Sequence, residues 1–473
     1  MASVGGSNGG GFDLAVVGAG SGGFSAAITA AELGANVALI GHGTIGGTCV
    51  NVGCVPSKTL IRAAEALHNG SAALRFAGIG SDARIDDWAA LIAQKDELVS
   101  SLRQAKYEDV LPTYNGIAYV AGQARLSETG VSVDGSVIEA KSVIIATGAS
   151  PSPPDIPGID TVPTLNSTTA MALEALPRSL LVIGGGYIGC ELGQMFARVG
   201  TAVTIVCRSR LLPEAEPEIS QALSEYLAAE GVTIWSGVAY QDIRQTETGV
   251  ALTVARGGEP EVLVAEQVLV TAGRRPNTRG LGLEEAGVAL TDRGAIVVDD
   301  RMRTSRPATY AAGDVTGRDE FVYMAAYGAR LAAENALNGD AQVYDSSVMP
   351  WVVFTDPQVA GIGLTERAAA QAGFKTKTSV LPLAHVPRAL AARDTRGLIK
   401  LVADADTDRL LGAHIIAPEG ADSIQTATLA LKYGMTVRDL AATIFPYLTT
   451  VEGLKLAAQT FDKDVSKLSC CAG

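Results

Sequence analysis

The sequence has few of the residues that mark several large classes of protein. Its 473 residues include six cysteines, too few for the disulfide framework of a secreted scaffold. No apolar run approaches the ~18 residues of a transmembrane helix. Aromatic residues make up 5% and offer no stripe for stacking bases, and a net charge of −13 opposes binding to nucleic acid or to an anionic membrane. We therefore expect a cytoplasmic globular protein without nucleic acid or stable membrane association.

Glycine, in contrast, is plentiful and recurs in two matching patterns. Each pattern follows an expected apolar strand, at 12–17 and at 179–183, and precedes a helix and a second strand, at 36–40 and at 202–207. Such βαβ units use glycine for a tight turn, for close approach of a pyrophosphate and for packing of helix on strand. Two units predict two dinucleotide sites, most simply in a flavoprotein that passes hydride between a nicotinamide and a flavin. The patterned glycines are Gly18, Gly20 and Gly23, then Gly184, Gly186 and Gly189.

Buried strands expected at 142–148 and 267–273 flank the second βαβ unit, which predicts that the second domain is inserted into the first. Beyond about residue 343 no nucleotide pattern remains, and the expected strands and helices indicate an α+β domain. The predicted fold class is α/β, with two Rossmann-like domains and a C-terminal α+β domain. The predicted boundaries are a flexible leader at 1–11, a first dinucleotide domain at 12–149 and 267–342, a second at 150–266, and the C-terminal domain at 343–473.

Four of the six cysteines form two pairs at opposite ends of the chain. Cys49 and Cys54 follow the first βαβ unit, where a redox-active pair could meet a flavin. The positive N-terminus of a helix expected at 56–67 would lower their thiol pKa from ~8.5 into the ~3.5–7.5 range. Cys470 and Cys471 lie in a polar tail two residues from the end. A disulfide reductase with a single site needs the first pair alone, so the second pair suggests a soft ligand that thiolates carry.

Taken together, the motifs resemble those of the pyridine nucleotide-disulfide oxidoreductases from about residue 12 to the C-terminus. The resemblance implies FAD in the first dinucleotide domain, NADPH in the second, and a C-terminal domain that forms a homodimer. The motifs beyond the two glycine patterns are Gly47, Thr48, Cys49, Cys54 and Lys58 in one run, Ala146, Thr147 and Gly148 in another, and the run 304–314 that ends in Asp314.

The resemblance also implies roles for single residues. Cys54 would face the flavin as the charge-transfer thiolate, and Cys49 would be the outer thiol that exchanges with substrate. Lys58 would lie beside flavin N5 with Glu191 as its ion-pair partner, and Tyr187 would cover the nicotinamide face of the flavin until the nicotinamide arrives. The residues implied to bind FAD are Gly18, Gly20, Gly23, Gly47, Thr48, Lys58, Thr147, Gly148 and Asp314.

The residues after the second strand of the second unit favour NADPH over NADH. An NAD enzyme carries an acidic residue there for the ribose 2′-hydroxyl, whereas this chain has Arg208 and Arg210. Two guanidiniums suit a 2′-phosphate. In the first unit the matching position is Gly41, which offers no carboxylate to the adenosine ribose of FAD, so that contact is missing or supplied elsewhere. His42 beside it is expected in an exposed turn, and a substitute contact to the ribose is the lesser alternative for it.

One departure separates this chain from the disulfide reductases it resembles. Their C-terminal domain carries a histidine, held by a glutamate, that protonates the thiolate leaving the substrate disulfide; here Glu452 is retained but Tyr447 replaces the histidine. A tyrosine with a pKa near ~10 is a poor proton donor and acceptor at neutral pH. None of the four histidines, at 42, 68, 385 and 414, lies near this position. Disulfide cleavage has therefore lost its acid–base residue.

Two dithiols without that residue favour a soft metal ion as substrate, and mercury(II) is the softest candidate. Tyr447 and the closing Cys470-Cys471 pair resemble the mercuric reductase family. That resemblance implies that NADPH reduces FAD, which reduces Hg(II) to Hg(0). It also implies that Cys470 and Cys471 of one subunit pass Hg(II), by thiol exchange, to Cys49 and Cys54 of the other, with Tyr187 and Tyr447 lining the final site.

The main alternative is a thioredoxin reductase-like enzyme, because large thioredoxin reductases also carry a C-terminal cysteine pair. Those enzymes keep the histidine, so Tyr447 speaks against this interpretation. Another NADPH-dependent disulfide reductase with an incidental tail, a non-catalytic flavoprotein and a mercury-binding chaperone are further alternatives. Cys190 and Cys207, each in an apolar segment, are expected to be buried. With about eleven residues before its first strand and no N-terminal Cys-x-x-Cys, the sequence resembles the catalytic core of the family.

Overall fold

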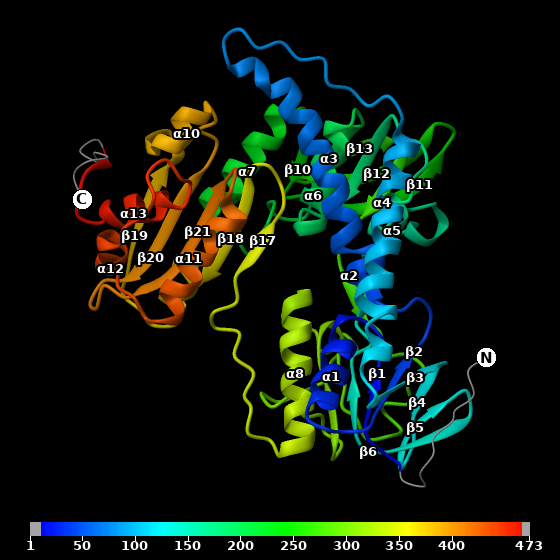
Figure 1. Cartoon of the computed structure of the whole chain (residues 1–473). Helices are drawn as coiled ribbons and strands as arrows, with labels where there is room; N and C mark the ends of the chain where they lie inside the picture. The colour runs from blue at the N-terminus through cyan, green and yellow to red at the C-terminus, as the bar shows by residue number, and fades with distance from the viewer. Residues whose placement is uncertain (1–10, 466–473) are drawn as a thin grey trace. The chain divides into compact units, whose positions relative to one another are not determined.

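The computed structural model describes residues 11–465, which divide into two compact units (Figure 1). The first unit holds the chain up to Ser57, Ile92–Ser152 and Gly273–Ser346; the second holds Lys58–Leu91, Pro153–Ala272 and the chain from Ser347 onward. The predicted leader, apart from residue 11, and the predicted ligands Cys470 and Cys471 lie outside the described residues.

The first unit is built on a mixed sheet in the order β3-β2-β1-β6-β5-β4, with β16 also paired to β6. The strands β1, β2, β3 and β16 run parallel to their neighbours, whereas β4, β5 and β6 pair antiparallel. Helices α1 and α8 pack side by side (Figure 1). The elements are β1 (Phe12–Val17), α1 (Ser21–Glu32), β2 (Val37–Gly41), α2 (Gly47–Val52), β3 (Ile117–Ala121), β4 (Ala124–Leu126), β5 (Gly130–Val133), β6 (Ser136–Ile145), β7 (Ala149–Pro151), β15 (Arg274–Pro276), β16 (Thr309–Ala311) and α8 (Val322–Asn338).

The second unit combines a parallel sheet in the order β10-β9-β8-β14 with an antiparallel sheet β11-β12-β13 and a C-terminal antiparallel sheet β17-β18-β21-β20-β19. Helix α11 packs against β18 and β21, and α13 packs against β19 and β20. The elements are α5 (Ser167–Ala170), β8 (Ser179–Ile183), α6 (Tyr187–Arg198), β9 (Ala202–Cys207), α7 (Pro217–Ala229), β10 (Thr233–Ser236), β11 (Ala239–Thr246), β12 (Gly249–Arg256), β13 (Glu259–Ala265), β14 (Gln267–Val270), β17 (Trp351–Val353), β18 (Gln358–Gly363), α9 (Glu366–Gln371), β19 (Thr376–Pro382), α10 (Pro387–Ala392), β20 (Leu398–Asp404), β21 (Leu410–Ala417), α11 (Gly420–Lys432), α12 (Val437–Ala442) and α13 (Glu452–Gln459).

The third glycine of each pattern is required because no side chain fits there. A Cβ on Gly23 would lie 1.7 Å from the carbonyl oxygen of Gly18, and one on Gly189 would lie 2.0 Å from that of Gly184. Gly18 and Gly184 also have φ angles of +120° and +121°, a region that L side chains rarely adopt. Both predicted βαβ units are therefore present, and each helix begins directly above its turn.

Helix α3 (Cys54–Ala72) begins two residues before the predicted helix and ends five residues later. The difference at the start arises because Pro56, the first residue of the predicted helix, lies inside its first turn. Proline is tolerated anywhere in the first turn, where backbone N–H groups have no partner within the helix, so the helix can start ahead of it. Cys54 is consequently the first residue of α3. Helix α4 (Trp88–Arg103) and α3 each pass from one unit to the other.

A buried lysine joins the two parts of the second unit. Lys400 on β20 is 1% exposed, and its Nζ donates to Glu216 at 3.1 Å, Glu218 at 2.8 Å and Glu366 at 2.8 Å. Burial opposes its charge, but the hydrogen bonds to the three carboxylates raise the pKa of Lys400 above its ordinary value. Glu216, 2% exposed, directly precedes α7, so this cluster fastens the part of the unit that contains α7 to the C-terminal sheet.

Replacing Lys400 with methionine should destabilise the second unit strongly. The variant leaves the buried carboxylate of Glu216 without its cation, and breaking a buried pair from one side costs ~3–5 kcal/mol. Guanidinium denaturation followed by circular dichroism measures the change. Lys375→Met is the matched control, because its pair with Asp406 is exposed and contributes less than ~1 kcal/mol. Equal loss in both variants would contradict the importance of the buried cluster.

Candidate active site

The first cysteine pair lies beside the first glycine pattern, in the first unit. Cys49 is half-buried on α2, and Cys54 is exposed at the start of α3. Helix α2 starts against the glycine turn, since a Cβ on Gly47 would lie 2.6 Å from the Cα of Gly20. Asn51 on α2 donates to the carbonyl oxygens of Ile45 and Gly47 at 2.8 and 2.9 Å and so fixes the turn that carries the cysteines.

Tyr107 is a neighbour of the cysteine pair that the sequence analysis did not identify. Its ring meets Phe24 edge-on at 4.8 Å, and its hydroxyl lies 3.2 Å from the Ser21 hydroxyl. Burial raises the pKa of Tyr107, and the nearby thiolate charges of Cys49 and Cys54 raise it further. Tyr107 stands on a single π-helical turn, Gln104–Glu108, more than fifty residues after the cysteines. No motif marks this position, so no sequence signal could have found it.

The predicted FAD-binding residues of the first unit converge on a site with uncapped backbone donors. Gly20 caps α1 without a side-chain hydrogen bond, which leaves N–H groups at the helix N-terminus for an anion such as a pyrophosphate. Thr147 and Gly148 are held by Asn277, which donates from Nδ2 to the Thr147 carbonyl at 2.9 Å and from its backbone N–H to Gly148 at 2.9 Å. The donors present therefore fit a dinucleotide.

Asp314 adds a half-buried acceptor to this site. Burial raises the pKa of Asp314 above its ordinary value, against the opposing charge of Arg274, whose Nε lies 3.8 Å from the carboxylate. A half-buried carboxylate gains from hydroxyl donors, which the ribityl chain of FAD would supply. The residues of the first unit thus fit the flavin nucleotide that the motifs imply.

The structure brings Lys58 and Glu191 together in the second unit. Lys58 Nζ lies 2.7 Å from Glu191 Oε2 and 4.8 Å from the centre of the Phe354 ring. The other carboxylate oxygen of Glu191, which is buried, accepts the backbone N–H of Phe354 at 2.9 Å. Lys58 follows Cys54 by one turn of α3, so Glu191 orients an ammonium on the helix that begins with Cys54.

One face of α6 is fastened to the segment Trp351–Asp356 along its whole length. At its start the Tyr187 ring stacks on Trp351, with centroids 5.7 Å apart and an interplanar angle of 22°. Burial raises the pKa of Tyr187 to about 12, with the charge of Glu214 as the second cause, so the phenol stays protonated at neutral pH. Two turns on, Gln194 donates to the Asp356 carbonyl at 2.7 Å and accepts its N–H at 2.8 Å.

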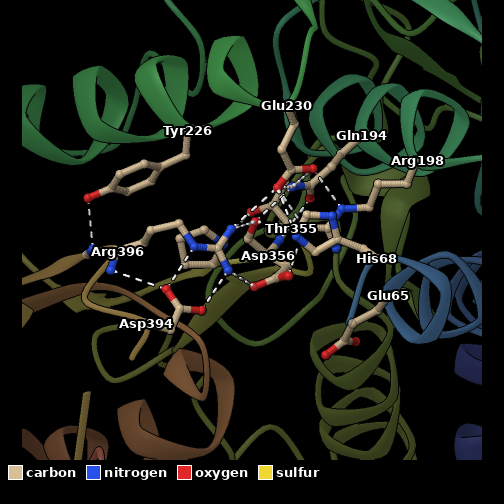
Figure 2. Close-up of polar contacts among 12 residues, drawn as sticks. Glu65, His68, Gln194, Arg198, Tyr226, Glu230, Thr355, Asp356, Asp394 and Arg396 are labelled. Carbon is tan, nitrogen blue, oxygen red and sulfur yellow. Dashed lines mark hydrogen bonds and ion pairs between the residues drawn. The ribbon is translucent and has the colours of Figure 1, made fainter. Parts of the chain in front are cut away.

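The far end of α6 is held by a cluster of alternating charges, shown in Figure 2. Arg198 contacts Glu230 at 2.6 Å and Asp356 at 2.8 Å, and Arg396 contacts Asp356 at 3.2 Å and Asp394 at 2.7 Å. His68 on α3 lies 3.9 Å from Glu230, and burial together with the charge of Arg198 lowers its pKa. Because Arg198 is buried with its partners, α6 has a rigid anchor opposite Tyr187.

The two arginines predicted to bind a 2′-phosphate differ in their surroundings. Arg208 is exposed directly after β9. Arg210 is half-buried, and its Nη2 donates to the carbonyl oxygens of Pro213 at 3.0 Å and Ala215 at 2.7 Å. Arg208 is thus the arginine open to a ligand, whereas Arg210 shapes the loop behind it. Gly186 caps α6 without a side-chain hydrogen bond, which again leaves backbone donors at a helix N-terminus.

In the C-terminal part, Tyr447 is 54% exposed, at a turn where Leu448 has a φ angle of +64°. Glu452 is buried and accepts the backbone N–H of Leu448 at 3.3 Å, so the retained glutamate supports this turn. Cys190 and Cys207 are buried, as expected, and burial raises the pKa of both thiols, that of Cys207 to about 11. His42 is exposed.

Among residues 11–465, no helix is long and apolar enough to cross a membrane. No group of three or more His, Cys, Asp or Glu side chains in this range is arranged to hold a metal ion.

Comparison with known proteins gives concordant results. Residues 12–333 match the family model of the pyridine nucleotide-disulphide oxidoreductases, and residues 349–458 match the dimerisation domain of the same family. A mercuric reductase of Staphylococcus aureus is 48% identical over all of this chain and 86% of its own length. One of Streptomyces lividans is 47% identical over 98% of this chain and 99% of its own.

Solved structures agree with the fold. The HOCl-induced flavoprotein disulfide reductase RclA of Escherichia coli, solved as a Cu(II) complex, is 31% identical, with a TM-score of 0.84 over 95% of this chain and 99% of that one. Without the Cu(II) label the same protein has a TM-score of 0.83 at 32% identity over 94% and 99% of the two chains. The fold class predicted from the sequence is confirmed.

Arg208→Glu should weaken NADPH more than NADH. A charge-assisted hydrogen bond contributes ~1.5–3 kcal/mol, so its loss should raise the KM for NADPH about tenfold or more while the KM for NADH stays constant or falls. Steady-state kinetics with both nucleotides measures the preference. Arg210→Lys is the control, since its side chain is engaged by loop carbonyls, and it should lower thermal stability more than it changes preference. An unchanged NADPH/NADH ratio in Arg208→Glu would refute the assignment.

Trp351→Leu should ease the displacement of Tyr187 by the nicotinamide. An aromatic pair contributes ~0.5–1.5 kcal/mol beyond its buried area, so the KM for NADPH should fall by ~2- to 10-fold with little change in kcat. Trp351→Phe keeps an aromatic ring beside Tyr187 and should behave as the wild type. Stopped-flow reduction of the flavin by NADPH provides the measurement, and equal behaviour of the two variants would argue against the stack as a restraint.

Proposed function

The chain belongs to the pyridine nucleotide-disulphide oxidoreductases and, within them, to the mercuric reductases, and we propose that it uses NADPH and FAD to reduce Hg(II) to Hg(0). The reaction balances as Hg(II) plus NADPH giving Hg(0), NADP⁺ and a proton. FAD, when bound, takes two electrons from NADPH and delivers them to the mercuric ion. The biological role is detoxification of mercury.

Tyr447 is the single residue on which the choice of substrate depends most. Its turn is kept by buried Glu452, but a phenol replaces the imidazole that a disulfide reductase needs to protonate a leaving thiolate. The proton balance of metal reduction needs no such acid, because a mercuric ion that gains two electrons leaves without a proton. Tyrosine in place of histidine at position 447 therefore disables disulfide cleavage but does not slow the reduction of Hg(II).

Within the first unit, Cys49 and Cys54 would hold the ion as thiolates. Cys54 stands at the positive N-terminus of α3, which favours the thiolate form that binds a soft metal. The protonated Tyr107 beside both sulfurs adds no competing charge. Lys58, held by Glu191, would place a positive charge near the flavin, and Tyr187 would guard the nicotinamide position.

We further propose that the subunits of a homodimer share each site. Cys470 and Cys471 of one subunit would capture Hg(II) and pass it to Cys49 and Cys54 of the other, one thiolate displacing another, because a two-coordinate dithiolate complex otherwise dissociates too slowly. Tyr447 would line the final site. A cytoplasmic location fits the need for NADPH and for thiols kept reduced.

The division into domains at 12–149 with 267–342, 150–266 and 343–473 is part of the same proposal. FAD would bind through the first segment pair, including Thr48 and Asp314. NADPH would bind through the second, with Gly184, Gly186, Gly189 and Arg208. The third would form the dimer.

The proposal is tested by NADPH oxidation in the presence of Hg(II) and excess thiol. Hg(II) should stimulate oxidation and release Hg(0) vapour in equal amount, whereas glutathione disulfide, lipoamide and thioredoxin should not. Absence of stimulation by Hg(II), or turnover of a disulfide instead, would overturn it in favour of a disulfide reductase.

The tail is tested by Cys470→Ala/Cys471→Ala in the same assay. Loss of the entry thiolates should lower Hg(II)-dependent turnover by at least about tenfold, because transfer by thiol exchange needs an incoming thiolate. Flavin reduction by NADPH in the absence of Hg(II) should be unchanged. Cys207→Ala serves as the control for loss of a cysteine, since that thiol is buried away from solvent. Full activity of the tail variant would remove the relay.

A further inference from the structure

The end of β2 lacks the side chain that normally anchors the adenosine ribose of a dinucleotide. In such units an acidic residue after the second strand accepts hydrogen bonds from the ribose hydroxyls. This chain has Gly41 there, with φ outside the left-handed region, so backbone conformation does not demand glycine. The reason for the glycine must be the space around it.

That space is taken by Tyr119. A Cβ on Gly41 would lie 2.5 Å from the Tyr119 hydroxyl oxygen and 2.9 Å from Cε2 of its ring. Real Cβ atoms essentially never approach another atom so closely. The tyrosine ring can therefore lie across the end of β2 because position 41 carries no side chain.

The strand register explains how Tyr119 reaches this place. Strand β3 pairs parallel with β2, with Tyr119 opposite Leu39 and Ala121 opposite Gly41. Residues 39 and 41 point to the same face of the sheet, so Tyr119 stands on the face to which a side chain at 41 would point. The tyrosine side chain is long enough for its hydroxyl to extend along the strands by about one residue pair, toward Gly41.

The hydroxyl also lies beside the first glycine turn. The same Cβ on Gly41 would be 2.8 Å from the Cβ of Ala19, which stands between Gly18 and Gly20 of that turn. The Tyr119 oxygen thus lies close to the glycine turn that would receive a pyrophosphate, at the carboxyl ends of β1 and β2.

The chemistry of this hydroxyl suits a sugar. Tyr119 is 38% exposed, and burial of the rest raises its pKa, so the phenol is protonated and both donates and accepts. Among residues 11–465 no hydrogen bond to its hydroxyl is found. A ribose hydroxyl is a neutral donor and acceptor of the same kind.

We propose that Tyr119 replaces the missing acidic residue and hydrogen-bonds the adenosine ribose of FAD, with Gly41 as the vacancy that admits it. The inference rests on FAD binding in the proposed function. Tyr119 is then a cofactor-positioning residue. Together, glycine at 41 and tyrosine at 119 replace a charged contact to the ribose with a neutral one.

Tyr119→Phe tests the hydroxyl alone. Apoprotein is prepared from the holoenzyme and titrated with FAD and with FMN, which lacks the adenosine, and binding is followed by flavin fluorescence. We expect the Kd for FAD to rise about three- to tenfold, as loss of one hydrogen bond implies, and the Kd for FMN to stay constant. Tyr114→Phe, which removes a phenol hydroxyl that donates to Glu32 at 3.4 Å, is the matched control and should change neither. An unchanged Kd for FAD, or an equal rise for FMN, would overturn the proposal.

Rescue separates an anchoring role from a merely structural one. Tyr119→Ala should weaken FAD. Adding Gly41→Glu together with Ala19→Gly, which removes the Cβ that would lie 2.8 Å from a Cβ at position 41, should restore affinity to the wild-type level or better, because the carboxylate then has the space that the ring and the Ala19 methyl occupied. If this triple variant binds FAD no better than Tyr119→Ala with Ala19→Gly while its apoprotein unfolds at the same temperature, the exchange is refuted. These titrations contain no mercury, so failure of Hg(II) turnover would leave them intact.

Discussion

The two glycine turns are the constraint on which the rest of the molecule depends, because each leaves no room for a single extra carbon atom. Gly23 against Gly18, and Gly189 against Gly184, let a helix start directly on the end of a strand with its N–H groups uncapped. The start of α2, which carries Cys49, lies against the first turn, and the second turn begins α6, which carries Tyr187 and Glu191. One steric feature, used twice, thus places the residues of both proposed nucleotide sites.

Contacts along helix α6 hold it rigidly within the second unit. Its half-buried start carries Tyr187, while its far end is locked by Arg198 between two carboxylates (Figure 2). The contacts between them alternate in kind: a ring stack, a carboxylate on a backbone N–H, and an amide that both donates and accepts. Because these partners are spread over about six residues of an adjoining extended segment, a shift of α6 would break all of them together.

Much of this architecture could be predicted from the sequence, since glycine spacing and apolar runs are local signals. The βαβ units follow from glycine spacing and apolar runs, and the pairing of Lys58 with Glu191 follows from motifs at fixed spacing. Apolar runs predict three of the five strands of the C-terminal sheet, β17, β20 and β21, but not β18 and β19. Tyr107 and Trp351 could not be found, because they approach their partners from distant parts of the chain at positions without a motif. Arg210 lies where the sequence predicts a contact to a 2′-phosphate, but its guanidinium donates to two loop carbonyls. No local sequence pattern indicates that these carbonyls compete with the phosphate.

The buried thiols have a meaning for an enzyme whose substrate seeks sulfur. Cys190 and Cys207 lie under the second glycine turn, where a bound mercuric ion would poison nucleotide binding. Burial closes them to solvent and keeps their protons on, so they offer neither the access nor the thiolate that capture requires. An enzyme whose substrate binds thiolates must keep that ion away from the cysteines outside its active site. Here burial keeps the thiols of Cys190 and Cys207 unreactive.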